Sequence, residues 1–242
     1  MPVFGSKFIF LDSVDSTNNY AATLIEQGKA ENGTVVMADY QEQGRGQRNN
    51  HWQANKGENL TFSLIWLPDN LSVHELVYVN WWVSLTLVRL LASFGIESQV
   101  KWPNDILVEN KKIAGILMEN KLQGDKVKCL IIGVGLNVNQ VFLPEEKAVS
   151  MSMITGEHSK IHKVLMELCV GLNETEGELK NPKQLKSSYE EKLFLNQETI
   201  CFTVDGIEEK GRILGINDHG QLLILHKDLV RTYNSGEITQ LY

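Results

Sequence analysis

Cysteine and positive charge are both scarce in this chain of 242 residues. The three cysteines, Cys129, Cys169 and Cys201, lie far apart and form no C-x-x-C pair, which argues against a disulfide framework and a cysteine zinc site. The 23 lysines and arginines are outnumbered by 30 aspartates and glutamates, so the net charge is −7. A protein whose main task is to bind a phosphate backbone has more positive than negative residues, so we expect no nucleic-acid partner.

A secretion signal is also lacking. The chain begins MPVFGSKFIF, without a charged region followed by a long apolar run, so we expect a cytoplasmic protein in a reducing setting. The most apolar stretch, 76–94, is long enough to span a bilayer, but it contains Asn80 and Arg89 and lacks positive flanks. Because charge in lipid is costly, we expect a buried core helix and no membrane partner.

Several common nucleotide and hydrolase motifs are missing. Residues 133–137 read Gly-Val-Gly-Leu-Asn, but the third glycine of a dinucleotide fingerprint is absent and no amphipathic helix follows, which excludes a Rossmann site. There is no Walker A loop, so any use of ATP is not standard P-loop phosphoryl transfer. There is no G-x-S-x-G either, which removes support for a serine hydrolase.

The apolar pattern predicts a chain that mixes strands and helices. Strands are predicted over 7–14, 34–38, 60–66, 98–102, 106–108, 112–118 and 127–133. Helices are predicted from Asp15-Ser16-Thr17-Asn18 to about 27, over 72–95 with Ser72 and Glu75 as a capping box, over 159–178 and over 182–195. Residues 40–58 and 139–157 are expected to be irregular, and a loop as long as 40–58 is usually functional or disordered.

The pattern of apolar and turn-forming residues changes near Glu198. Short alternating strands follow, separated by turn signals at Asp205-Gly206, Asp218-His219-Gly220 and Ser235-Gly236. We therefore predict two domains, residues 1–195 and a small β-barrel over 196–242.

Polar or glycine-containing segments could carry chemistry at three places. In 41–48, glycines would let the backbone approach an anion while Arg45 supplies charge; an ordinary solvated loop is the alternative. The segment Lys101-Trp102-Pro103-Asn104-Asp105 follows a strand, where sites collect, although a satisfied turn would look the same. In 112–117, Gly115 could mark the close approach of a ligand, or the segment could be a plain hairpin with a solvated lysine.

Taken together and in order, these motifs resemble the biotin–protein ligase family. The resemblance rests on Asp15 to Asn18, Gln41 to Gly46 with Trp52, Lys101 to Asp105, Lys112 to Leu117, Gly133 to Asn137 and Gly236-Glu237-Ile238. It covers about residues 7–240, and it is most specific in K-W-P-N-D and K-x-A-G-I-L. It implies an α+β fold of the class II synthetase-like type, with a mixed β-sheet, flanking helices and a C-terminal SH3-like β-barrel.

The resemblance implies a two-step ligase. Biotin and Mg-ATP would give biotinyl-5′-AMP and pyrophosphate, and the adenylate would then acylate one lysine of a biotin carboxyl carrier domain. A lipoate or octanoate ligase or transferase of the same fold is the alternative within enzymes. A biotin-responsive DNA-binding repressor is the alternative outside them, but only 14 residues precede Asp15, so we expect a monofunctional form without a helix-turn-helix domain.

The resemblance also assigns residues to roles. Arg45, Lys101 and Lys112 would be catalytic, because they would neutralise the biotin carboxylate and the α-phosphate. The biotin-binding residues that it implies are Ser16, Thr17, Asn18, Gln41, Gly44, Arg45, Gly46, Gln47, Trp52, Lys112, Gly115, Gly133 and Gly135. For ATP and Mg²⁺ they are Arg45, Arg48, Trp52, Lys101, Asn104, Asp105, Lys112 and Asn137, with the metal held through ATP and not by a dedicated protein site.

The chain departs from the family pattern in its glycine-rich loop and near its end. Gln47 stands where members often have a second arginine, and Asn50 where they have a further basic residue, while Arg48 and His51 remain. The basic residue that some members have just after Gly-Glu-Ile is also missing. We expect the loop 40–58 to be mobile without biotin and to order over the ligand, which would keep water from a mixed anhydride.

Overall fold

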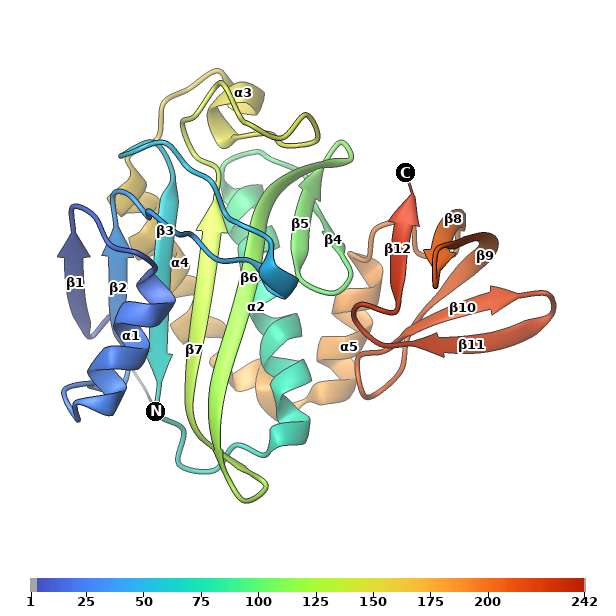
Figure 1. Cartoon of the computed structure of the whole chain (residues 1–242), viewed down its shortest axis with the longest axis horizontal. Helices are drawn as coiled ribbons and strands as arrows, with labels where there is room; N and C mark the ends of the chain where they lie inside the picture. The colour runs from blue at the N-terminus through green and yellow to red at the C-terminus, as the bar shows by residue number, and fades with distance from the viewer. Residues whose placement is uncertain (1–3, 242) are drawn as a thin grey trace.

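The computed structural model describes residues 4–241, which form two β-sheets with helices around the larger one (Figure 1). The larger sheet has seven strands in the order β1-β2-β3-β7-β6-β5-β4. β1 and β2 are parallel and all the other neighbours are antiparallel, so the sheet is mixed as predicted. Its strands are β1 (Lys7–Leu11), β2 (Thr34–Ala38), β3 (Leu60–Trp66), β4 (Gln99–Lys101), β5 (Asp105–Val108), β6 (Lys111–Gln123) and β7 (Lys126–Leu136).

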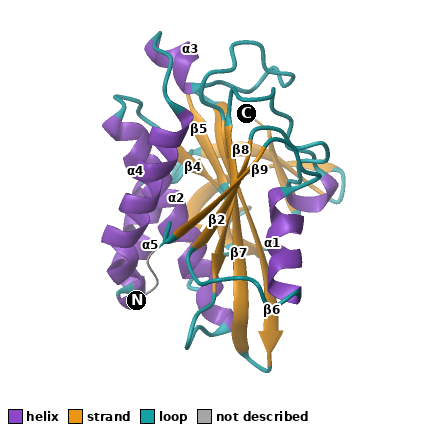
Figure 2. Ribbon diagram, turned by 90° about the vertical axis from the view of Figure 1, so that its left-hand side faces the viewer, coloured by secondary structure: helices purple, strands orange, loops and turns teal. Residues whose placement is uncertain are grey.

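Helices cover both faces of this sheet, but unequally (Figure 2). One face packs on α2 (Leu76–Ser93), α4 (Ile161–Thr175) and α5 (Pro182–Glu191), and the main hydrophobic core lies between them. The other face carries α1 (Thr17–Glu26) over a small apolar cluster that includes Ala21 and Ile131. Because α1 covers only part of this face, the rest of it is available to build a site.

The apolar helix α2 lies in the core. A short 3-10 turn, Val73–Glu75, precedes it, and the predicted capping box between Ser72 and Glu75 is present. The stretch Val73–Ser93 is long and apolar enough to cross a membrane by length and composition, but 61% of its most apolar window is buried inside the protein. The structure therefore confirms a buried core helix.

The second sheet has five antiparallel strands in the order β11-β10-β9-β8-β12, which confirms the small C-terminal β domain of the SH3-like kind. Its strands are β8 (Thr199–Val204), β9 (Ile207–Ile216), β10 (Leu222–His226), β11 (Leu229–Tyr233) and β12 (Ile238–Leu241). The predicted boundary at 195/196 falls between α5 and β8. A hydrogen bond from Trp102 Nε1 to the carbonyl of Gly220, 2.7 Å long, ties the two parts together.

The structure corrects the predicted elements at a few places. β7 continues through Gly133 and Gly135 to Leu136, whereas we expected the strand to end at Gly133, because β3 and β6 pair with it along this whole length. The region 139–157, expected to be irregular, contains the helix α3 (Met151–Thr155), whose N-cap is Ser150. The loop 40–58 contains a 3-10 turn, Gln47–Asn49, and another such turn, Glu176–Lys180, follows α4.

Candidate active site

A cavity of about 830 Å³ opens on the face of the larger sheet that carries α1. It is lined by the N-terminus of α1, the loop 41–53, Phe62 of β3, the strands β6 and β7, and the segments 101–105, 144–147 and 238–240. Of the residues predicted for the site, all except Gly44 and Asn137 are among its lining residues. Motifs that are far apart in sequence are thus brought to one place.

The floor of the cavity consists of Gly115 and Leu117 of β6 and Gly133 and Gly135 of β7. The register pairs Gly115 with Gly135 and Leu117 with Gly133, so all four face the same side of the sheet. A Cβ on Gly133 would lie 2.4 Å from Asn18 Oδ1, and one on Gly135 would lie 2.3 Å from the ring of Trp52. The glycines are therefore needed for close approach.

The roof of the cavity is the loop 41–53. Gln41 anchors its beginning, because its Oε1 accepts hydrogen bonds from the backbone N–H of Thr17 at 2.8 Å and from Thr17 Oγ1 at 3.1 Å. The two arms of the loop meet where Trp52 N–H donates to the carbonyl of Gly44. A Cβ on Gly44 would lie 2.2 Å from the carbonyl oxygen of Trp52, which explains a glycine at this position although it does not line the cavity.

Trp52 joins the roof to the floor. Its ring lies against Gly135, and Lys112 Nζ lies 5.6 Å from the ring centroid, within the range of a cation–π contact. The indole Nε1 is buried without a hydrogen-bond partner among the described residues. The aromatic wall and the unsatisfied donor suit a ligand that is partly apolar and has hydrogen-bond acceptors.

The segment 101–105 is held from behind by buried groups. Asn80 Nδ2 and the Tyr189 hydroxyl both donate to the carbonyl of Pro103, at 2.7 and 3.2 Å. Burial raises the pKa of Tyr189 well above its usual range, which keeps the hydroxyl protonated as a donor. These contacts fix the turn that presents Lys101 and Asp105 to the cavity.

Lys112 is placed by an ion pair with Asp105, with Nζ 2.9 Å from Oδ1. The two residues come from neighbouring strands, β5 and β6, and both are partly exposed toward the cavity. Asn104 Nδ2 donates to the carbonyl of Ile116 at 2.6 Å, so its amide braces β6 as well as lining the cavity.

The charge of the cavity is opposite to that of the chain. Its lining includes five cationic residues, Arg45, Arg48, Lys101, Lys112 and Lys147, against two carboxylates, Asp105 and Glu145. The chain as a whole has a net charge of −7. Walls of one sign raise the local concentration of ligands of the opposite sign, so this cavity suits an anion.

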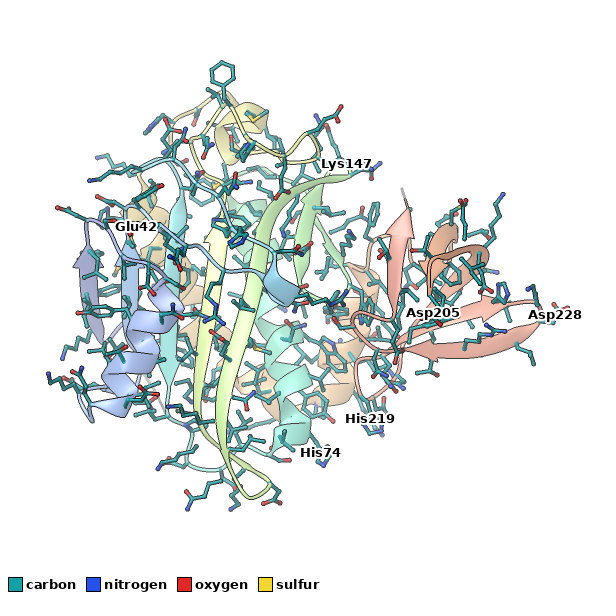
Figure 3. The ribbon with its side chains drawn as sticks, viewed as in Figure 1. Glu42, His74, Lys147, Asp205, His219 and Asp228 are labelled. Atoms are coloured by element: carbon teal, nitrogen blue, oxygen red, sulfur yellow. The ribbon has the colours of Figure 1, made fainter. Side chains whose placement is uncertain are left out.

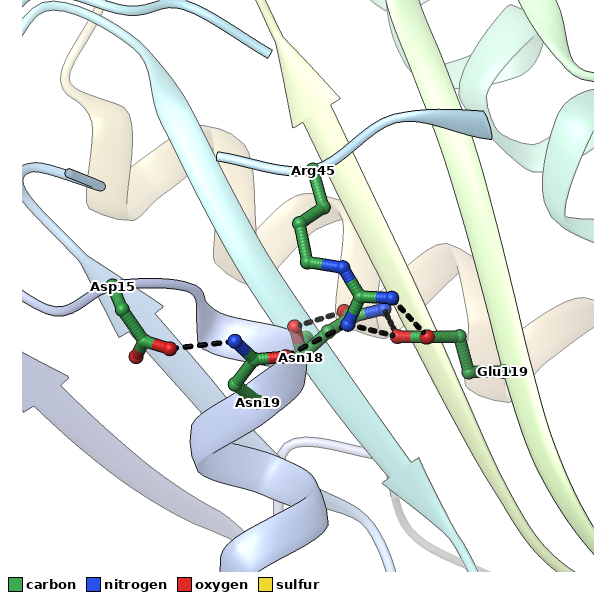
Figure 4. Close-up of polar contacts among 6 residues, drawn as sticks. Asp15, Asn18, Asn19, Arg45 and Glu119 are labelled. Atoms are coloured by element: carbon green, nitrogen blue, oxygen red, sulfur yellow. Dashed lines mark hydrogen bonds and ion pairs between the residues drawn. The ribbon is translucent and has the colours of Figure 1, made fainter. Parts of the chain in front are cut away.

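Arg45 forms hydrogen bonds to two other parts of the chain (Figure 4). Its guanidinium forms a fork with Glu119 of β6, with Nη2–Oε1 at 2.6 Å and Nη1–Oε2 at 3.2 Å, and Nη1 also donates to Asn19 at 2.7 Å. Asn19 in turn donates to Asp15, and this hydrogen bond is the main reason that the pKa of Asp15 is lowered. The roof, α1 and β6 thus share one polar network.

Arg48 connects the roof to the C-terminal β domain. Its Nη2 donates to Ser235 Oγ at 3.0 Å, and its guanidinium lies against Gly236, where a Cβ would come within 2.7 Å. Arg48 itself has a φ of 55°, in the left-handed region that costs a side-chain-bearing residue about 1 kcal/mol or more. The strained residue of the roof is thus the one that contacts the β domain.

Asn137 lies apart from the cavity. Its side chain is buried, and its Nδ2 donates to the carbonyls of Val149, at 3.1 Å, and Lys112, at 3.5 Å. It therefore secures the segment behind Lys112, and its predicted contact with Mg-ATP stays a prediction. Among the described residues, 4–241, no group of three or more His, Cys, Asp or Glu side chains could hold a metal ion.

Three residues near the predicted set were missed. Glu119 shares a strand face with Gly115 and Leu117, so its period-2 spacing was the available signal. Ser63 pairs with Gly133 across the sheet, and its hydroxyl contacts Thr17 and Asn18. Lys147 lies near the start of β6 (Figure 3), where its carbonyl accepts from Lys112 N–H at 2.7 Å, and nothing in its local sequence marks it.

Known proteins share this architecture. Residues 10–137 match the Biotin/lipoate A/B protein ligase family. The bifunctional ligase/repressor BirA of Bacillus subtilis is 31% identical over 98% of this chain and 74% of its own length. The biotin–[acetyl-CoA-carboxylase] ligase of Mycobacterium tuberculosis is 32% identical over 59% of this chain and 53% of its own length. A solved structure of the biotin protein ligase from Aquifex aeolicus, in complex with biotin and ATP, superposes with a TM-score of 0.77 at 30% identity, covering 98% of this chain and 99% of that one.

Proposed function

Because the chain belongs to the Biotin/lipoate A/B protein ligase family, we propose that it is an ATP-dependent biotin–protein ligase. It activates biotin as biotinyl-5′-AMP and then transfers biotin to a lysine of a carrier domain. The observation that carries this proposal is the cavity itself. It combines a glycine floor, an aromatic wall and a cluster of cations in a chain that is acidic overall.

The first step joins two anions. A carboxylate oxygen of biotin attacks the α-phosphorus of ATP, an O–P bond forms, and the bond to the pyrophosphate leaving group breaks. Lys112 and Arg45 are suited to hold the carboxylate beside the phosphate, because they reach the cavity from the floor strand and from the roof. Fixed cations in such a cavity stabilise the charge that grows in the transition state. Mg²⁺ would enter bound to the phosphates of ATP, and it supplies further neutralisation of their charge.

The polar end of the cavity is suited to the ureido head of biotin. Ser16, Thr17 and Asn18 lie at the start of α1 and are almost fully buried, and Gln41 fixes Thr17 from the roof. Each polar atom of a buried ureido group needs a partner, and these side chains offer both donors and acceptors. The apolar ring of biotin would then lie along the floor, against Trp52.

In the second step the neutral amine of a carrier lysine attacks the acyl carbon of the adenylate. An amide bond forms, the acyl–phosphate bond breaks, AMP leaves with the electron pair, and the amine nitrogen loses one proton. The name of the Mycobacterium tuberculosis relative points to acetyl-CoA carboxylase as the source of such a lysine, and we propose a biotin carboxyl carrier domain as the partner. The three free cysteines are in keeping with a reaction in the reducing cytoplasm.

The comparisons favour the ligase over the DNA-binding alternative. The Aquifex aeolicus structure, whose description names biotin and ATP, matches this chain along nearly the full length of both proteins. The family includes lipoate ligases by name, so the choice of acid is the point to test.

The test measures exchange of labelled pyrophosphate into ATP with biotin, lipoate or octanoate as the acid. We expect exchange with biotin and none with the other two. Transfer of biotin to a purified carrier domain, with and without ATP, tests the second step. Exchange that needs lipoate or octanoate, or that needs no acid, would contradict the proposal.

A further inference from the structure

Glu119 contacts two of the residues proposed to bind biotin, although it is not itself among the lining residues of the cavity. It lies on β6, on the same face as the floor, and its side chain is one-third exposed. Its carboxylate receives the Arg45 fork, and its Oε2 also accepts a hydrogen bond from Asn18 Nδ2 at 2.7 Å. One carboxylate thus joins the roof to α1 (Figure 4).

The geometry leaves Arg45 able to bind a ligand while it is held. Its described hydrogen bonds to Glu119 and Asn19 use three N–H groups, whereas a guanidinium has five. Since Glu119 lies outside the cavity lining, it grips the guanidinium without occupying the position of a ligand. A two-point fork also fixes the plane of the guanidinium, which a single hydrogen bond would not do.

The same carboxylate orders Asn18. With Nδ2 donating to Glu119, the Oδ1 atom of Asn18 is directed toward Ser63, whose hydroxyl lies 2.5 Å away, and it also lies against Gly133 of the floor. The orientation of this amide is therefore set by Glu119 at its nitrogen and by Ser63 at its oxygen.

We propose that Glu119 is a positioning residue, which orients Arg45 and Asn18 for the acid group and the polar head of the substrate. This inference rests on the proposed function for the identity of the ligand. The contact between Glu119 and the roof does not depend on the proposed function, because it is present without a ligand. Because both partners are partly exposed, with 43% of the Arg45 side chain accessible, we attribute the effect to geometry more than to the strength of the ion pair.

The chain offers a matched control. Lys121 lies two positions after Glu119 on β6, and its Nζ pairs with Glu26 at the end of α1, at 2.7 Å. This pair also joins β6 to α1, but it touches neither the roof nor the cavity. E119Q and E26Q therefore remove one carboxylate each from similar exposed pairs, and only E119Q alters the hold on Arg45. Glutamine also keeps an acceptor for Asn18 Nδ2.

The experiment measures biotin binding by calorimetry for the parent protein, E119Q, E26Q, R45A and the R45A/E119Q double variant. We expect E119Q to raise the biotin Kd about tenfold, the size expected when a charged hydrogen bond is lost, and E26Q to leave it unchanged. In the R45A background, E119Q should add little, because it acts through Arg45. An unchanged Kd in E119Q, or the same fold-change with and without Arg45, would overturn the proposal.

A second measurement keeps this inference separate from the proposed function. Amide hydrogen exchange of residues 44–52 in the ligand-free protein should be faster in E119Q than in the parent and E26Q. If the parent binds no biotin, the proposed function fails, while the exchange result still decides whether Glu119 holds the roof. If exchange in E119Q equals that in E26Q, the positioning role fails even if biotin binds.

Discussion

The floor of the cavity lies on strands that are paired with neighbours along their length, whereas its roof is a loop held by a few backbone hydrogen bonds and by side chains. β7 is paired with β3 and β6 along the glycine positions, so Gly133 and Gly135 are fixed by the sheet. The roof is held by Gln41 at its start, by Arg45 and Arg48 in the middle and by Trp52 at its end. The floor therefore sets the shape of the cavity, while the roof brings the charges of Arg45 and Arg48 to it.

The largest effect is expected at a cation that belongs to the floor strand. Lys112→Ala removes the charge that Asp105 fixes in the cavity, and we expect adenylate formation to fall about 100- to 1000-fold. Biotin-dependent exchange of pyrophosphate into ATP measures the rate of adenylate formation. Lys111→Ala is the control, because Lys111 is the exposed neighbour on the same strand and does not line the cavity. Equal losses in both variants would contradict a specific role of Lys112.

A change in the shape of the floor should come next. In Gly135→Ala, the new Cβ would meet the Trp52 ring at 2.3 Å, so the roof must lift. We expect biotin affinity to fall about tenfold or more, as measured by calorimetry, because overpacking of this kind costs about 1–3 kcal/mol. Gly177→Ala adds the same methyl group where nothing lies within 4 Å, and it should leave affinity unchanged. If Gly135→Ala binds biotin as tightly as the parent protein, biotin binding does not require the close contact between the roof and the floor.

The same contrast explains how much could be predicted from the sequence. Strands such as Leu60–Trp66, and the capping box of Ser72 and Glu75, are local patterns, and both were found. The extension of β7 through its glycines was not, because the hydrogen bonds that hold it extended come from β3 and β6. Local sequence carries no information about such partners.

For the site, the motifs identified the floor and the roof but not the contacts between them. Arg45 was placed by its glycine-rich loop, whereas Glu119, its partner, is 74 positions away and lies just beyond a known motif. Lys147 comes from a segment expected to be irregular, and the pairing of its backbone with Lys112 brings it to the cavity. Asn137 belongs to a recognised motif, yet its amide is directed to Val149 and Lys112. These contacts join segments that are far apart in the sequence, so local patterns do not reveal them.

A variant of Lys147 tests whether the cations near the start of β6 contribute more to ATP binding than to biotin binding. It comes from the segment 144–147, which lines the cavity but belongs neither to the floor nor to the roof. Lys147→Ala should raise the KM for ATP about fivefold to tenfold, because an ammonium–phosphate contact is a charged hydrogen bond, and leave the Kd of biotin unchanged. The exposed Lys128→Ala on β7 is the control. A rise in the biotin Kd alone would assign Lys147 to the acid instead.

The smallest effect is expected at Arg48, and it separates the side-chain contact from the backbone strain of the roof. Arg48→Ala loses the contact with Ser235 but keeps a Cβ at a φ of 55°, whereas Arg48→Gly loses the contact and also relieves the strain. If the contact with the β domain holds the roof, both variants should speed amide exchange in residues 44–52 about twofold to threefold, the size of a weak exposed interaction. Only Arg48→Gly should then gain stability, by about 1 kcal/mol, in a denaturant titration. Faster exchange in the glycine variant alone would mean that the roof is held by its own backbone and not by the β domain.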